Sequence, residues 1–536
     1  AVPPNAGTLL QQAAPQPAAT APARASGLAV EPTPGAALPA TAPFEVTALL
    51  LSGNTRFDTA TLLALVADAQ GQRLTLAELD TVVSRITAYY RRAGYPLARA
   101  LIPAQTITAG AVRIDIIEAR FGQVRLDNRS AVSSVLLSDT LAPLYAGALI
   151  SQASLDRSLL LLSDVPGVSL GALLKPGTAV GTADLTVTTE ALPPLAGQLT
   201  LDNHGNAYTG RTRVAAGASW FNPLHQGDVL SASLLSTGSA MVYTRLGYEG
   251  LLNGQGSRVG AALSALRYTL GGAAADLQAH GTAAVTSLWL AHPLRRSIGL
   301  NLRSQWQFDH LVLRDEVDTG NVHSDRNVDI GTLTLGGDAL DALLPASSDT
   351  WQLGLAAGRV RFNDAAAAVA DAATAQAQGR FAKMNLVLAH YQALAAQTTL
   401  ALTATAQLAQ SNLDPSQKLA LGGPYNVRAY PSGALSGDRG YTLSAELRHD
   451  LAFTGAGAGQ WQAVAFVDSG RVTINQSPWR AGANAASLSG VGLGLNWNGP
   501  SLWSARASVA APVGGASALA GATRGTRGWI ELRQGF

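Results

Sequence analysis

The feature that most constrains the fold is a regular alternation of apolar and polar residues between Leu195 and Phe536. A period of two is typical of β-strands with two unlike faces, because successive side chains point to opposite sides of a strand. We count about sixteen such runs, each near twenty-one residues with its connection, which is typical of transmembrane barrels. No run reaches the roughly 18 unbroken apolar residues of a membrane helix. We therefore predict an antiparallel transmembrane β-barrel over residues 193–536.

The connections between these runs differ in length in a regular way. Short turns are predicted at 222–228, 253–256 and 498–501, and longer connections at 270–280, 311–326, 363–379 and 411–437. Neighbouring strands of such a barrel run in opposite directions, so alternate connections lie at opposite ends. If the first strand rises from the periplasm, every long connection lies outside the cell or in the lumen.

Composition agrees with a barrel and excludes several functions. Hydrophobic residues make up 47% of the chain and charged residues only 13%. The net charge of +2 gives no indication of a nucleic-acid partner. Cysteine is absent, which excludes disulfides and thiolate metal sites. No Walker loop and no HExxH motif occurs, so we expect neither an enzyme nor a cofactor or metal.

Two small α+β units of order β-α-α-β-β precede the barrel. In residues 44–120, strands are predicted at 44–51, 97–102 and 111–118, with helices at 58–67 and 75–93. In residues 121–192, strands are predicted at 122–128, 168–174 and 183–189, with helices at 131–142 and 154–164. Asp58 and Ser151 are predicted helix N-caps. Tandem domains of this kind favour binding, since exposed strand edges accept an extended segment, although a pair of spacers is the alternative.

The first 43 residues form a tail rich in Ala and Pro, typical of an extended linker. Thr8–Ala14 predicts two helical turns that Pro15 ends. Residues Ala1–Pro3 lack the basic and apolar regions of a signal peptide, so if the protein is exported we expect that peptide to have been removed.

One long connection, 411–437, contains an arginine that needs a partner. Turn residues such as Gly422, Gly423 and Pro424 predict an ordered loop, but no acidic residue stands next to Arg428. The best partner is Asp468, which interrupts the apolar strand 461–470. We predict that the two pair and dock the loop on the barrel wall. In a wet lumen this contact is expected to contribute about 1.5–3 kcal/mol.

The residues around this pair resemble a known family. Val427-Arg428-Ala429-Tyr430 is similar to the VRGY motif in the lumenal loop of two-partner secretion transporters (TpsB; the hemolysin-activator and filamentous-hemagglutinin-transporter type). Phe466-Val-Asp468-Ser-Gly470 is similar to the FxDxG strand motif of that family, whose Asp meets the loop Arg. Ala429 stands where the family usually has Gly, which would be costly if that position needed a positive φ.

Other segments carry the same resemblance. Two motifs resemble those of POTRA domains, the periplasmic modules of this superfamily: Tyr90…Gly94-Tyr95-Pro96 and Gly110–Ile114. Asp202–Gly205 and Asn222–Leu224 resemble the start of a TpsB barrel. A terminal Phe536, on one face with Ile530 and Leu532, looks like the recognition signal for barrel assembly.

The resemblance implies a location and a function. The barrel would lie in the bacterial outer membrane among its lipids, inserted by the barrel-assembly machinery, with the two domains in the periplasm. It would translocate a secreted TpsA-like exoprotein recognised through its N-terminal secretion domain. The segment at 8–14 would be a plug helix, with a plain tail as the alternative. A barrel-assembly insertase and a passive porin remain alternative functions.

A second cluster of polar residues lies at Asp309–Asp325. It gathers several acids with His310 and His323, and such a loop could hold a divalent cation. The simpler interpretation is a solvated extracellular loop.

Overall fold

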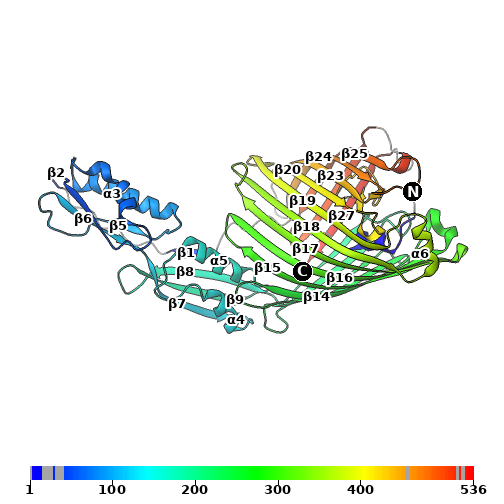
Figure 1. The fold of residues 1–536 in the computed structure, drawn as a ribbon, viewed down its shortest axis with the longest axis horizontal. Coiled ribbons are helices and arrows are strands. Elements are labelled where there is room, and N and C mark those ends of the chain that lie inside the picture. The colour runs from blue at the N-terminus through cyan, green and yellow to red at the C-terminus, as the bar shows by residue number, and fades with distance from the viewer. Residues whose placement is uncertain (1–2, 15–27, 31–40, 454–458, 515–517, 521–524) are drawn as a thin grey trace.

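The structure is a computed structural model that describes residues 3–14, 28–30, 41–453, 459–514, 518–520 and 525–536. Most of the linker predicted within residues 1–43 lies outside these residues. Two small domains follow one another at one end of a large barrel, and the second domain lies between the first and the barrel (Figure 1). In the described residues no helix is long and apolar enough to cross a membrane.

The first domain places two helices against a small mixed sheet. Its elements are β2 (Phe44–Glu45), β3 (Ala48–Ser52), α2 (Thr59–Ala64), β4 (Arg73–Leu74), α3 (Leu76–Arg92), β5 (Arg99–Leu101) and β6 (Ala111–Ile117). Thr75 and Glu78 form a capping box at the start of α3. Gly94, whose φ of 89° lies in the left-handed region, ends the helix. The strand predicted at 44–51 is divided, because β2 pairs with β4 whereas β3 pairs with β6.

The second domain repeats this plan with an additional strand. Its elements are β7 (Arg120–Arg129), α4 (Ser134–Leu141), α5 (Gln152–Ser163), β8 (Val168–Pro176) and β9 (Thr182–Ala191). The helix predicted from 131 begins later, because the Asn128 side chain bonds Val132 and Ser134 and holds a turn there. Strand β1 (Leu28–Val30), which belongs to the N-terminal tail, pairs in parallel with β8. The sheet order β1-β8-β9-β7 therefore has one edge occupied by the tail of the chain.

The prediction of a barrel of about sixteen strands is confirmed: sixteen antiparallel strands close into a ring, with the first strand beside the last. They are β10 (Leu195–Asp202), β11 (Arg213–Phe221), β12 (Val229–Ser236), β13 (Met241–Leu251), β14 (Arg258–Thr269), β15 (Ala279–Arg295), β16 (Leu300–Val317), β17 (Val322–Leu340), β18 (Ser347–Phe362), β19 (Gly379–Ala395), β20 (Thr398–Ala409), β23 (Arg439–Leu451), β24 (Gln460–Thr473), β25 (Ala485–Asn498), β26 (Trp503–Pro512) and β27 (Arg527–Gly535).

Strand length varies strongly around the ring. Strands β16 and β17 have 18 and 19 residues, whereas β10 and β12 have 8 each. The long connection predicted at 311–326 is therefore wrong, because β16 and β17 continue through it and turn only at η3 (Asp318–Gly320). The charged residues there broke the apolar alternation in the sequence, although the ladder of strand hydrogen bonds continues. The connection predicted at 363–379 does exist and contains α6 (Ala365–Ala372).

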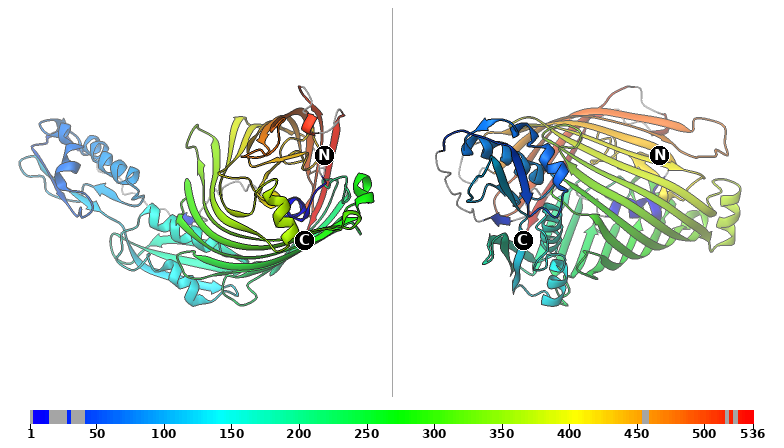
Figure 2. Two further views of the ribbon diagram at one scale, coloured as in Figure 1. Left: turned by 45° about the vertical axis from the view of Figure 1, so that its right-hand side comes forward. Right: turned by 60° about the vertical axis from the view of Figure 1, so that its left-hand side comes forward.

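Two segments lie inside the ring. Helix α1 (Ala6–Ala13) packs within it, as Figure 2 shows. The second segment, residues 411–437, joins β20 to β23 and is called the lumenal loop below. It carries η4 (Pro415–Gln417) and a hairpin of β21 (Leu419–Leu421) and β22 (Leu435–Gly437).

Candidate functional site in the barrel lumen

The structure brings Arg428 and Asp468 together at the inner wall of the barrel. Arg428 Nη2 lies 2.6 Å from Asp468 Oδ1 and its Nε 2.8 Å from Oδ2, so the guanidinium grips the carboxylate through two bonds. The backbone amide of Arg428 also donates to Asp468 Oδ2 at 3.1 Å. The Asp468 side chain is fully buried. The expectation of a wet contact is therefore wrong at this carboxylate.

Further partners of Arg428 come from the neighbouring strand β23. Nη1 lies 2.6 Å from Glu446 Oε1, and Nη2 donates to Ser444 Oγ at 3.0 Å. The guanidinium carbon stands 3.4 Å from the centroid of the Phe466 ring, within cation–π range. Burial tends to lower the pKa of Arg428, but Asp468 and Glu446 outweigh it, so the pKa lies above the usual value.

Glu446 and Ser444 could not be assigned from the sequence alone. Both lie in an amphipathic run where many polar residues face the lumen, and only the β23–β24 register singles them out. That register pairs Ser444 with Asp468 and Glu446 with Phe466. Glu446 also accepts from Arg448 at 2.6 Å, so two arginines and two carboxylates form one network.

The motif residues around Arg428 pack rather than react. Val427, Ala429 and Tyr430 are buried against apolar wall residues that include Phe466 and Leu488. Gly470 leaves room for this contact, since a Cβ there would lie 2.9 Å from Leu421 Cδ2. Tyr425 differs, because its side chain is largely exposed, although its ring lies edge-on to His204 and its hydroxyl donates to Glu531 Oε2 at 3.1 Å.

Ala429 fits its position without the predicted backbone cost. Its φ is not positive; the described non-glycine residues with positive φ lie elsewhere. The small residue is instead required on the wall beneath it, because a Cβ on Gly490 would lie 2.5 Å from the Ala429 methyl. The absence of the usual glycine therefore leaves the backbone of the lumenal loop unstrained.

A second charged contact fixes the other part of the lumenal loop. Arg326 on β17 bridges Asp315 on β16, at 2.7 Å, and Asp414 in the loop, at 2.5 Å. Lys418 pairs at 3.0 Å with buried Asp438, which directly follows the loop, and so holds the two ends of the loop together. The contact to the wall in the second half of the loop is the Arg428–Asp468 pair. The loop is thus tied to the wall by ion pairs at both of its halves.

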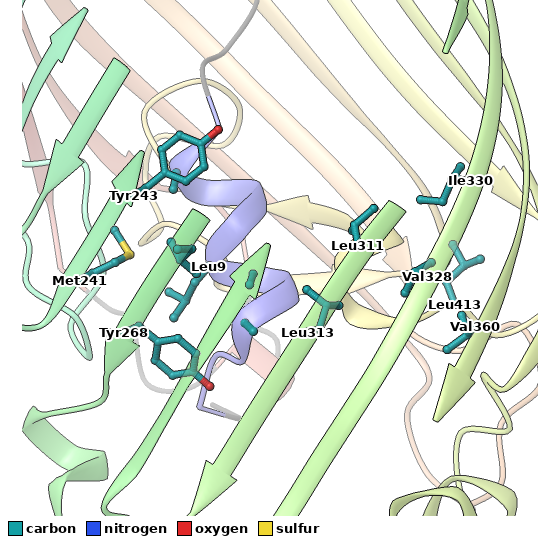
Figure 3. Close-up of a cluster of buried hydrophobic side chains, with 14 of the residues drawn as sticks. Leu9, Met241, Tyr243, Tyr268, Leu311, Leu313, Val328, Ile330, Val360 and Leu413 are labelled. Atoms are coloured by element: carbon teal, nitrogen blue, oxygen red, sulfur yellow. The ribbon is translucent and has the colours of Figure 1, made fainter. Parts of the chain in front are cut away.

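Helix α1 fills space between the lumenal loop and the wall of β14–β16. Ala6, Leu9 and Ala13 are buried against wall residues such as Tyr268 and Leu313 (Figure 3). The Ala6 amide donates to Asp315 Oδ1 at 2.7 Å, and Gln11 Nε2 donates to the Ser416 carbonyl at 2.5 Å. Asn5 caps the helix through the Thr8 amide.

The first and last strands of the barrel meet beside these segments. Arg213 pairs with buried Asp202 at 2.8 Å and donates to the Gln12 carbonyl of α1. His204 lies 3.8 Å from Asp202 and 3.9 Å from Glu531. These three groups could converge on a metal ion, but the guanidinium on Asp202 opposes a cation there. At the same seam, Phe536 exchanges two backbone hydrogen bonds with Gly197 and extends the closure by one residue.

The structure keeps only part of the polar cluster predicted at 309–325 together. His310 pairs with Asp329 of β17 at 2.6 Å rather than with His323. Two acids of the predicted cluster, Glu316 and Asp318, form a group with His280 of β15 that could hold a metal ion.

One enzyme-like spacing also has a structural explanation. Gly167–Gly171 matches the pattern GxSxG, but Ser169 lies within β8 and pairs with Glu190 of β9. A nucleophile elbow needs a sharp strand-to-helix turn, which is absent at this position.

Comparison with known proteins decides the family. Residues 181–497 match the family described as haemolysin secretion/activation protein ShlB/FhaC/HecB, and residues 44–119 match the POTRA domain of ShlB type. The chain belongs to this family. It is an outer-membrane transporter of two-partner secretion that exports a partner exoprotein, and not an enzyme.

Individual relatives agree with this membership. The chain is 30% identical over 448 residues to the heme/hemopexin transporter protein HuxB of Haemophilus influenzae, covering 83% of this chain and 79% of HuxB. It is 27% identical over 208 residues to the outer membrane transporter CdiB of Escherichia coli, covering 38% and 35% of the two chains. A solved structure of CdiB from Escherichia coli has the same fold, with a TM-score of 0.72 over 94% of this chain and 92% of that one, at 21% identity.

Proposed function

We propose that this arrangement is the resting state of the transporter and that secretion requires α1 to leave the lumen while the lumenal loop stays docked. The observation that carries this proposal is the unequal attachment of the two segments. Arg326 of the wall and Arg428 of the loop each form an ion pair that ties the loop to the wall. Helix α1, Ala6–Ala13, contains no charged residue. It can therefore enter water without stranding a charge in the lumen.

We further propose that the second periplasmic domain receives the exoprotein along strand β8. This edge is suited to an extended segment, because β1 already pairs there through Leu28–Ala172, Ala29–Leu173 and Val30–Leu174. A segment of the N-terminal secretion domain would replace β1 and form the same kind of backbone ladder. Release of β1 would free the chain that leads to α1.

A reversible cross-link tests this exchange. The chain has no cysteine, so the double variant Ala29→Cys/Leu173→Cys would introduce the only thiols, at positions that are register partners. We expect secretion of the co-expressed exoprotein to stop when the disulfide forms and to return when it is reduced. The single cysteine variants serve as matched controls and should secrete normally.

The two halves of the proposal fail in different ways. If the oxidised double variant secretes as well as the single variants, the β8 edge is not the receptor. The isolated pair of domains, residues 44–190, gives a second readout, because each domain has its own apolar core. Failure of this pair to bind the secretion domain, beside binding by the full chain, would place recognition in the barrel.

A further inference from the structure

Two arginines face each other on the outer surface of the barrel. Arg359 on β18 and Arg380 on β19 are direct register partners. Both are exposed, and both lie on the outward face, since Leu355 on that face is 45% exposed whereas Val360 on the other face is buried. Like charges directly opposite on neighbouring strands destabilise a sheet. An anion bound between the two guanidinium groups would therefore remove this repulsion.

The protein supplies no such anion within the described part of the chain. The nearest acid by register is Asp329, the partner of Arg359 on β17. Its carboxylate is already engaged, at 2.5 Å by Arg361 and at 2.6 Å by His310. Within the described residues, neither Arg359 nor Arg380 forms an ion pair with an acidic side chain.

An apolar groove begins directly beside this pair. The next outward row pairs Ala357 with Ala382, and the row after it pairs Leu355 with Met384. Trp306 and Leu333 continue the lining on β16 and β17, and the groove has a volume of about 640 Å³. The small side chains of Ala357 and Ala382 keep the groove open next to the guanidinium groups.

The direction of the strands places these features in the membrane. Strand β10 starts at the periplasmic domain, so β18 runs outward and β19 returns. Arg359 lies near the outer end of β18, and Arg380 near the outer start of β19. The arginine pair thus lies on the extracellular side of the groove, where an outer-leaflet lipid has its headgroup.

We propose that this surface binds a phosphorylated glycolipid of the outer leaflet, with a phosphate between Arg359 and Arg380 and an acyl chain in the groove. Two guanidinium groups suit a phosphate because each donates two parallel hydrogen bonds to its oxygens. The bound phosphate replaces the repulsion between the arginines by two attractions.

The proposal is tested by adding lipid A to the full chain in detergent. Native mass spectrometry then measures the fraction of the protein that carries bound lipid. We expect lipid A with both phosphates to remain bound and the dephosphorylated lipid to be lost. The double variant Arg359→Gln/Arg380→Gln should weaken binding by about tenfold for each arginine. Arg471→Gln is the matched control, because Arg471 is an exposed arginine on the outer face of β24, and it should bind as the wild type does.

A second variant examines the groove. Ala357→Phe fills the groove but leaves both arginines, so it should weaken lipid A without changing the binding of inorganic phosphate. Equal lipid A binding by the double variant and the Arg471→Gln control would overturn the proposal. So would equal binding of the dephosphorylated lipid, or unchanged lipid A binding in Ala357→Phe. Barrel folding is checked in each variant by its heat-modifiable mobility in gels.

Discussion

The lumenal loop and helix α1 occupy the same lumen but are held by different forces. The loop is attached through buried ion pairs, with Arg428 on Asp468 at its centre. Helix α1 is attached by apolar residues such as Leu9 and by hydrogen bonds to its backbone and side-chain amide groups. Removing one partner of a buried ion pair is costly because the other charge is stranded. The difference indicates a fixed element beside a removable one.

The largest effect on secretion is expected when the central ion pair of the lumenal loop is removed. Arg428→Ala and Asp468→Ala should each cost about 3–5 kcal/mol, because the Asp468 side chain is fully buried. That is enough to undock a loop but not to unfold a barrel. We expect each variant to insert and to lose most secretion.

The double variant distinguishes a pair from two independent residues. It should secrete little worse than either single variant, because one interaction can be lost only once. Secretion of the exoprotein is measured beside heat-modifiable mobility as a check on folding. Additive losses would contradict the pairing, and normal secretion by Arg428→Ala would contradict the role of the loop.

The second prediction concerns α1 and should give the opposite phenotype. Leu9 is fully buried, so Leu9→Asp should remove about 2–3 kcal/mol of apolar contact and expel the helix. We expect higher single-channel conductance in planar bilayers with secretion retained. Deletion of residues 3–14 should reproduce this result. Unchanged conductance in both variants would show that α1 does not limit the pore.

The third prediction separates charge from shape at position 428. Arg428→Lys keeps a cation near Asp468 but cannot bridge Asp468, Glu446 and Ser444 together. We expect a loss of about 1.5–3 kcal/mol and partial secretion, between the wild type and Arg428→Ala. Secretion equal to that of Arg428→Ala would show that the several hydrogen bonds of the guanidinium group, and not its positive charge alone, hold the loop.

The smallest effect is expected at Ala429. Its backbone already has an ordinary φ, so Ala429→Gly relieves no strain and only removes a buried methyl group. We expect a change of about 1 kcal/mol or less in loop stability and near-normal secretion. A large gain in secretion would show that the position favours glycine after all.

The sequence was sufficient where local pattern decides structure. Alternation identified the barrel, and the short motifs at Arg428 and Asp468 indicated a pair that the structure places 2.6 Å apart. Residues that depend on register could not be found in this way. Glu446 joins the network only because β23 and β24 pair as they do, and the position of α1 depends on Asp315, which is 309 residues away from Ala6.

The error at 311–326 has a similar physical origin. A strand that faces lipid must be apolar on its outer face, but one that stands in water need not be. His310, Arg314 and Glu316 therefore resemble a loop in sequence although they belong to β16.

The unequal lengths of the strands have a consequence for the emerging exoprotein. A spanning strand needs about 9–11 residues, so β16 and β17, with 18 and 19 residues, rise roughly 20 Å above the membrane. The short strands β27 and β10, with 9 and 8 residues, leave the opposite side low. A chain leaving the pore is thus screened on one flank and meets open water on the other. A closed ring offers no free strand edge for pairing. The extended wall of β16 and β17 can therefore keep an unfolded, aggregation-prone chain away from the bilayer without forming a sheet with it.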